Sequence, residues 1–173
     1  MKKKLKLNTF GYFTHYWPAI LFAGLTMWSL YLMLTTTDSA TLQRTLYIFY
    51  FCGPIGVLIF FIQKRRLQYT IIKIALTPLE IEKVICYLED NKGWKRKHKS
   101  DSIYVATTQS RWLSGSWGEQ ITIEQDHNII YINSICDPNK NPSLTSWGRN
   151  KRNIKTFKER LALYEKAEVL KSF

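Results

Sequence analysis

The sequence predicts an α-helical transmembrane hairpin followed by a small α+β domain, and three observations support this fold class. Two long apolar runs, residues 17–36 and 45–62, contain no charged side chain. Beyond them, apolar residues recur first with a helical period and then with a period of two. Basic clusters flank the pair of runs on its outer sides, at Lys2–Lys6 and Lys64–Arg66. The chain therefore divides into a basic cytoplasmic N-terminal tail (residues 1–16), the hairpin (17–62) and a cytoplasmic α+β domain (63–173).

Length and charge make the two apolar runs membrane-spanning candidates. About 18 to 20 helical residues match a hydrocarbon core about 30 Å thick. A charge at the helix centre costs about 2.5–3.5 kcal/mol or more, so the absence of charge in both runs is informative. Aromatic residues gather where each run begins, at Tyr12, Phe13, Tyr16 and Trp17 and at Tyr47 and Tyr50, as expected at a membrane interface.

The positions of lysine and arginine predict the orientation of the hairpin. The connector, residues 35–44, carries one acid and one base, whereas its outer flanks are strongly basic. We therefore expect a multi-pass protein of the bacterial inner membrane with the connector outside and both termini cytoplasmic. One alternative makes the first run a cleavable signal peptide, in which case the second run stops transfer and the domain stays cytoplasmic. Another makes both runs core helices of a soluble protein, but they are apolar all round.

Small residues in the apolar runs favour close helix packing. Gly53 and Gly56 flank Pro54 in the second run, and Gly24 lies in the first. Such residues let a neighbouring helix approach closely, either within the hairpin or between copies of the chain.

Net charge and cysteine count limit the classes of partner. The chain of 173 residues carries a net charge of +12, and beside a bilayer such an excess favours the anionic lipids of the inner leaflet. Nucleic acid is the other candidate and is disfavoured by the membrane anchor. Three cysteines, Cys52, Cys86 and Cys136, lack the spacing of a zinc site and are expected as unpaired, buried thiols in a reducing compartment.

The cytoplasmic part begins with a strand, or an extended continuation of the membrane helix, at residues 69–76. The next four residues, Thr77 to Glu80, form a capping box with a proline at the first helical position. Ile81, Val84, Ile85 and Leu88 then mark one apolar helix face. Gly93 suits the left-handed position after the helix.

Alternation predicts an antiparallel meander between residues 94 and 135. The clearest strands cover residues 103–108, 120–124 and 129–134, separated by polar turns. A long amphipathic helix then begins near Ser146. We expect an antiparallel sheet of about four to five strands with two helices on one face.

The same region resembles a bacterial domain family of unknown function. The resemblance covers residues 81–161 and rests on Gly93-Trp94, a strand ending Asn133-Ser134, the step Gly148-Arg149-Asn150, and Arg152 in a basic helix. The loop from Asp137 to Thr145 is longer here than the family's tight turn. The resemblance implies the fold rather than an activity.

The first candidate site lies at the start of the last predicted helix. Free backbone N–H groups and the positive end of the helix dipole favour an anion there, and several cations add to this preference. A phosphate, a carboxylate or a lipid headgroup fits this chemistry. The alternative is that Ser146 or Asn150 caps the helix and the cations are solvated. The candidate residues are Ser146, Gly148, Arg149, Asn150, Lys151, Arg152 and Lys155.

The second candidate site is a basic patch for the membrane surface. It joins the bases after the second run to a basic segment that holds one tryptophan, which suits a bilayer interface. The same segment also suits single-stranded nucleic acid, or a solvated strand edge that lysines protect from pairing. The patch residues are Lys64, Arg65, Arg66, Lys92, Trp94, Lys95, Arg96, Lys97 and Lys99.

No motif indicates catalysis, a metal or a cofactor. The three histidines, His15, His98 and His127, lack the spacing of a metal site or a catalytic group. We therefore expect a non-enzymatic binding or assembly module that docks on anionic lipid and on a protein partner or another copy. Two alternatives are a sensor that binds a small phosphorylated anion near Ser146–Arg152, and a subunit or immunity-type inhibitor of a larger membrane complex.

A cluster of aromatic side chains leaves a further choice. Either they line a cleft or partner surface, or they fill the core of the small sheet. The residues are Trp112, Trp117, Trp147, Tyr104 and Tyr131.

Overall fold

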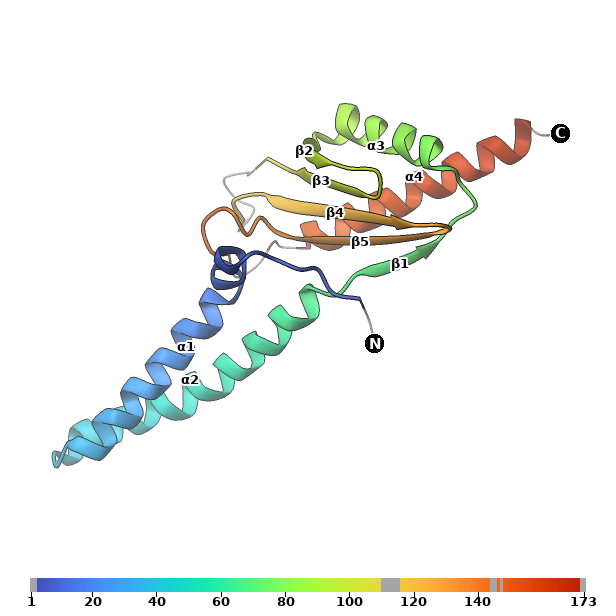
Figure 1. The fold of residues 1–173 in the computed structure, drawn as a ribbon. Helices are drawn as coiled ribbons and strands as arrows, with labels where there is room; N and C mark the ends of the chain where they lie inside the picture. The colour runs from blue at the N-terminus through green and yellow to red at the C-terminus, as the bar shows by residue number, and fades with distance from the viewer. Residues whose placement is uncertain (1–2, 110–115, 144–145, 147, 172–173) are drawn as a thin grey trace.

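The structure is a computed structural model that describes residues 3–109, 116–143, 146 and 148–171. It confirms the predicted fold class, because two long apolar helices precede a five-stranded antiparallel sheet and two further helices (Figure 1). The elements, in chain order, are α1 (Thr9–Thr35), α2 (Ser39–Arg66), β1 (Thr70–Lys73), α3 (Pro78–Lys92), β2 (Lys95–Lys99), β3 (Ile103–Thr107), β4 (Glu119–Asp126), β5 (Ile129–Cys136) and α4 (Arg149–Lys171).

Helices α1 and α2 are each long and apolar enough to cross a membrane. They pack against each other and leave large apolar side chains exposed, including Leu34 at 79% and Phe51 at 67%. Both begin before the predicted runs of 17–36 and 45–62 because the side chains that cap them lie earlier in the chain. Asn8 accepts a hydrogen bond at the start of α1, and Asp38 does so at the start of α2.

Two glycines of α2, Gly53 and Gly56, allow close packing within the hairpin. A Cβ added at Gly56 would lie 3.1 Å from the Cβ of Phe22, and one added at Gly53 would lie 3.7 Å from Thr26. These two glycines therefore do what the sequence predicted. Gly24 does not serve packing within the hairpin, since an added Cβ there meets nothing within 4 Å.

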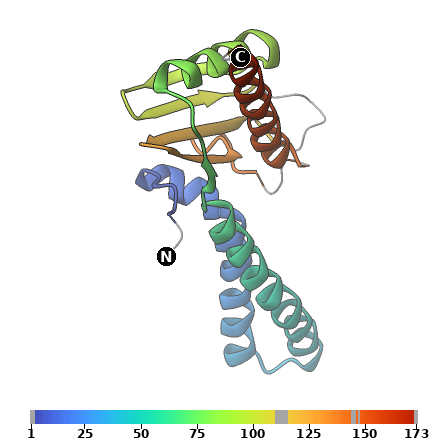
Figure 2. The same cartoon turned by 90° about the vertical axis from the view of Figure 1, so that its right-hand side faces the viewer.

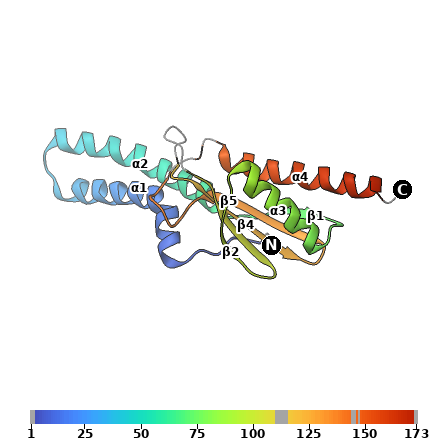
Figure 3. The ribbon, with the colours of Figure 1, turned by 90° about the horizontal axis from the view of Figure 1, so that it is seen from above.

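Helix α1 bends between its first turns and the rest. The first turns run across the base of the domain, and the remainder turns away beside α2 (Figure 3). Pro18 lies inside the helix, where its ring and missing N–H disturb the bond to the carbonyl of Thr14.

Helix α3 forms as its local signals predicted. The Glu80 backbone N–H donates to Thr77 Oγ1 at 3.4 Å, and the Thr77 N–H donates to Glu80 Oε2 at 2.7 Å, which completes the capping box. Gly93 ends the helix with a φ of +66°, in the left-handed region that favours glycine.

The sheet has the order β1-β5-β4-β3-β2, and every neighbouring pair is antiparallel. Residues 69–76 thus include a strand, β1, which pairs with β5 at one edge. Helices α3 and α4 cover one face of the sheet (Figure 2). Ile121, Ile130 and Ile132 project into this core beside Phe157 of α4, and all four are fully buried.

Trp94 belongs to this core, which corrects its predicted place in a membrane-surface patch. It is 3% exposed, and its ring stacks on that of Phe157 with centroids 6.3 Å apart. The left-handed turn at Gly93 ends α3, and the next side chain returns to the interior. Trp94 therefore adds to domain stability and cannot reach a bilayer.

The opposite face of the sheet receives the start of the chain. The Leu5 N–H donates to Leu67 O at 2.8 Å, and the Tyr69 N–H donates to Lys3 O at 3.2 Å. Leu5 also packs against Leu67, Tyr69 and Ile135. Residues 1–16 were predicted as a basic tail. The described residues before α1 instead pair with the chain beside β1, and α1 already begins at Thr9.

Candidate functional site

The first candidate site, at the start of α4, is organised around an internal carboxylate. Glu119 of β4 is fully buried, and its Oε2 lies 3.0 Å from the guanidinium of Arg149. Thr108 and Ser116 donate hydroxyl hydrogen bonds to the same carboxylate. Arg149 also donates to the Gln109 carbonyl at 2.9 Å. Glu119 therefore occupies the place that the sequence assigned to an external anion.

The remaining residues of the predicted anion site have varied roles. The Ser134 hydroxyl donates to Asn150 Oδ1 at 3.2 Å, and the Asn150 N–H donates to Ser146 Oγ at 3.5 Å. Gly148 adopts a φ of +79° immediately before the helix. Ser146 therefore accepts a bond from the start of α4, as the capping alternative expected, whereas Asn150 lies inside the helix and bonds to β5.

Three cations of the predicted anion site remain on the outer surface of α4. Lys151 and Arg152 are exposed, and Lys155 lies 3.7 Å from Glu159. Both partners of this last pair are largely exposed, so the pair adds at most a few tenths of a kcal/mol. The structure does not gather the predicted residues into one anion pocket.

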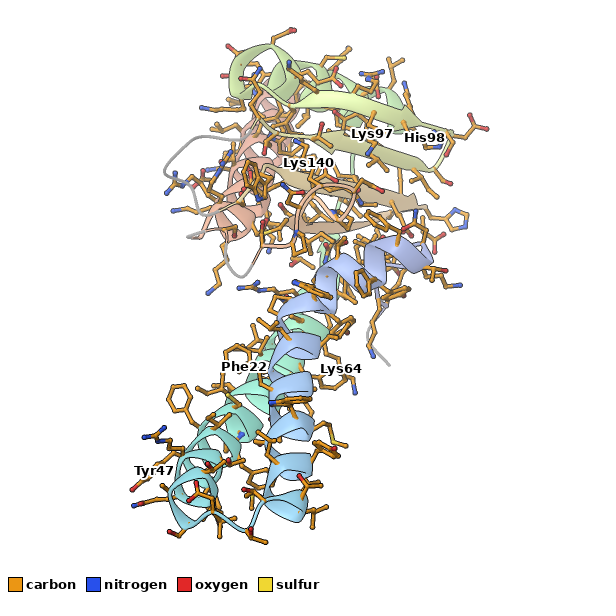
Figure 4. The ribbon with its side chains drawn as sticks, turned by 90° about the vertical axis from the view of Figure 1, so that its left-hand side faces the viewer. Phe22, Tyr47, Lys64, Lys97, His98 and Lys140 are labelled. Carbon is orange, nitrogen blue, oxygen red and sulfur yellow. The ribbon has the colours of Figure 1, made fainter. Side chains whose placement is uncertain are left out.

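The second candidate site separates into two surfaces. Strand β2 is the sheet edge furthest from β1, which continues from α2. Figure 4 shows Lys64 on the hairpin and Lys97 on the part of the domain away from the hairpin. The basic residues after the second run and those of residues 92–99 therefore cannot contact one flat membrane surface together, which corrects the predicted patch.

Two cations of β2 are engaged within the domain. Arg96 donates to Glu89 Oε1 at 2.8 Å and to Glu82 Oε1 at 2.9 Å. Lys99 lies 2.9 Å from the same Glu82 oxygen. The hydrogen bond from Arg96 outweighs partial burial and, with one from Tyr104, lowers the pKa of Glu89. Arg96 and Lys99 thus tie β2 to α3 and are not free for lipid.

The other cations of residues 92–99 point to solvent. Lys92, Lys95 and Lys97 are exposed, and within the described part of the chain no ion pair involves them. The pairing register shifts between Arg96 and His98, so Lys97 lies at an irregularity in the edge strand. This edge is the part of the predicted patch that stays open.

The cations near the hairpin surround its junction with the domain. Lys64 lies over the Phe60 ring, 5.9 Å from its centroid, and Arg66 donates to Gln63 Oε1 at 3.3 Å. Lys3 lies 2.6 Å from Glu124 and 4.2 Å from the Tyr131 ring centroid. Lys2 lies outside the described residues. Lys4, Lys6, Lys64 and Arg65 are exposed.

Sequence reasoning missed the long-range contacts that fasten the hairpin helices to each other and to the domain. Thr14 Oγ1 donates to the Pro138 carbonyl at 2.6 Å. His15 Nε2 lies 3.0 Å from the Gln63 carbonyl. Asn133 Nδ2 donates to the carbonyls of Arg66 and Gln68, both at 2.9 Å. Each contact joins residues far apart in the chain, so no local pattern signals it.

The described histidine, cysteine and acidic side chains do not gather into a metal centre. They include no group of three that could hold a metal ion. Burial raises the pKa of the Cys136 thiol, which disfavours the nucleophilic thiolate. The three cysteines are free thiols, but Cys86 and Cys136 are only half-buried, contrary to the expectation of buried thiols.

Of the aromatic residues that either line a cleft or fill the core, Trp112 and Trp147 lie outside the described residues. Tyr104 is buried in the core and donates to Glu89 at 2.7 Å, while Tyr131 is half-buried. Trp117 is exposed. The described aromatic residues therefore do not share one environment.

Comparisons with protein-family models, curated proteins and solved structures give no match for the chain.

Proposed function

We propose that the chain is a membrane-anchored, non-enzymatic binding or assembly module of the bacterial inner membrane, with both termini and the α+β domain on the cytoplasmic side. The observation that carries this proposal is the direct fastening of the domain to both hairpin helices. Thr14 of α1 bonds to the loop after β5, and Asn133 of β5 bonds to the end of α2. An anchor built in this way holds the domain in one orientation relative to the bilayer.

The distribution of open cations supports two different partners for the two sides of the domain. Lys4, Lys6, Lys64 and Arg65 flank the hairpin, where an anionic leaflet attracts each exposed base by about 1 kcal/mol. Lys92 ends α3, and Lys95 and Lys97 lie on the edge strand β2; Figure 4 shows Lys97 on the part of the domain away from the hairpin. We assign the first group to anionic lipid and the second to an acidic surface of a protein partner.

The test is co-purification of the full-length protein in a mild detergent. The double variant K95E/K97E reverses charge at the far edge, whereas K158E/K166E makes the same change on the exposed side of α4. We expect a stoichiometric partner with the parent chain and with K158E/K166E, and its loss with K95E/K97E. Absence of a stoichiometric partner, or equal retention by both variants, would contradict the proposal.

A further inference from the structure

The first turns of α1 have two distinct sides. Phe10, Phe13 and Trp17, spaced i, i+3 and i+7, share one side of the helix and are 58%, 48% and 38% exposed. The centroids of the Phe13 and Trp17 rings lie 5.1 Å apart, so two of the three exposed rings contact each other. Gly11, Thr14 and His15 lie on the other side and are buried.

The buried side is fixed to the rest of the protein. Thr14 donates to the Pro138 carbonyl, and a Cβ added at Gly11 would lie 3.4 Å from Pro138 Cβ. His15 contacts the carbonyl of Gln63 at the end of the apolar part of α2. These contacts prevent the helix from rotating its aromatic side toward the domain. That side must face whatever surrounds the base of the domain.

The course of the helix identifies those surroundings. Figure 4 shows the first turns of α1 running across the base of the domain, while the remainder descends beside α2. Pro18 follows the first turns, and α1 as a whole is long and apolar enough to span a membrane. The first turns therefore lie at the level where α1 enters the bilayer.

The chemistry of this segment suits the headgroup region. Between Thr9 and Trp17 no side chain is acidic, lysine or arginine, and exposed Lys6 and Lys64 flank the segment. Aromatic rings favour the interface between headgroups and hydrocarbon, and a helix with one such face lies in the plane of the membrane. If this side of the helix faced water, three large aromatic rings would be exposed together. The surfaces of soluble proteins rarely group such rings.

We infer that residues 9–17 form an interfacial helix, whose Phe10, Phe13 and Trp17 insert into the lipid–water interface of an anionic bilayer. The inference rests on the membrane-spanning hairpin of the proposed function and adds a third membrane contact. Through Thr14 and Pro138, this contact also connects the bilayer surface to the loop of residues 137–143.

The depth of nitroxide labels tests the inference in the full-length protein. The three native cysteines are replaced by alanine, and single cysteines are placed at Phe13, at Met27 midway along α1, and at Lys158 on α4. The protein is reconstituted in nanodiscs of mixed zwitterionic and anionic lipid. Collisions with oxygen and with a water-soluble nickel complex report depth. We expect Met27 deep, Lys158 aqueous and Phe13 between them.

Other patterns contradict the inference in separable ways. A label at Phe13 as accessible to nickel as one at Lys158, with Met27 still deep, overturns the interfacial helix and leaves the hairpin standing. A Phe13 label shielded from both reagents indicates a protein contact, which also overturns it. An aqueous label at Met27 defeats the proposed function itself.

A second measurement leaves the native cysteines in place. Lipids brominated just below the headgroups quench nearby tryptophan fluorescence, and lipids brominated near the chain ends quench deeper tryptophans. We expect Trp17→Phe to remove most of the shallow quenching and Trp28→Phe to remove most of the deep quenching. Unchanged shallow quenching in Trp17→Phe would overturn the inference.

Discussion

Helices α2 and α4 sort their side chains in opposite ways. Helix α2 exposes Phe51 and Leu58, whereas α4 buries Phe157 and Leu161 and exposes Lys158. The difference follows from what surrounds each helix. Helix α4 has a sheet on one side and water on the other, so it needs an apolar stripe. Helix α2 has the partner α1 and, in our account, lipid, so apolar residues suit its whole surface.

The two regions also treat charge differently. The apolar parts of the hairpin contain no charged side chain, while the domain buries Glu119 completely. The domain tolerates this carboxylate because Arg149, Thr108 and Ser116 all contact it. Removing one partner of a buried ion pair leaves an uncompensated charge in the interior, which strongly destabilises the folded protein.

Breaking that ion pair should cause the largest change in the free energy of unfolding. Arg149→Met leaves Glu119 buried without its cation and should lower the free energy of unfolding by about 3–5 kcal/mol. Arg152→Met removes a nearby exposed cation and should change it by less than about 0.5 kcal/mol. Denaturant unfolding in nanodiscs, followed by near-ultraviolet circular dichroism, measures both. Equal effects would show that Glu119 does not depend on Arg149.

A matched pair of leucines compares the two regions directly. Leu88→Ala in α3 removes a fully buried side chain and should destabilise the domain by about 3 kcal/mol. Leu58→Ala in α2 truncates an exposed side chain of the hairpin and should leave unfolding of the domain unchanged. The same unfolding measurement applies. A comparable loss from Leu58→Ala would mean that Leu58 packs against protein.

Removing the Asn133 side chain should loosen the junction of the two regions. Asn133→Ala deprives the Arg66 and Gln68 carbonyls of their donor and should cost about 2 kcal/mol. Amide hydrogen exchange should rise around residues 66–70. Asn153→Ala, which removes one bond to Ser134, serves as the control and should leave exchange at the junction unchanged.

The smallest expected effect concerns pH. The pKa of Glu89 is lowered in the folded state, mainly by Arg96. Its stabilisation is therefore present above the unfolded value near pH 4.3 and is lost as pH falls through the lowered folded pKa. Arg96→Met should cost under about 1 kcal/mol at pH 7 and weaken the pH dependence below pH 5. Lys95→Met, on the same strand, should leave that dependence intact.

Local signals explain what the sequence could predict. The capping box at Thr77, the left-handed Gly93 and the alternation in β3 to β5 each depend on neighbouring residues. The apolar composition of α1 and α2 likewise predicted the hairpin. None of these features requires knowledge of which distant segments meet.

Long-range packing explains what the sequence could not predict. Arg149 looked like a ligand for an external anion because its partner, Glu119, lies thirty positions earlier in the chain. The contact between the start of α4 and β4 has no local sequence pattern. Trp94 looked like a membrane-interface residue because its neighbours are basic. Its ring instead packs in the core against Phe157 of α4. The pairing of Lys4 with Gln68 likewise joins two segments on either side of the hairpin.

The most direct test of the account is the accessibility of single cysteines in intact cells. In a chain without native cysteines, Thr37→Cys lies between α1 and α2, and Lys158→Cys lies on the exposed side of α4. A membrane-impermeant maleimide should label Thr37→Cys in intact spheroplasts and Lys158→Cys only after permeabilisation. Labelling of Lys158→Cys in intact spheroplasts, or protection of Thr37→Cys there, would contradict a hairpin that spans the membrane with its domain inside.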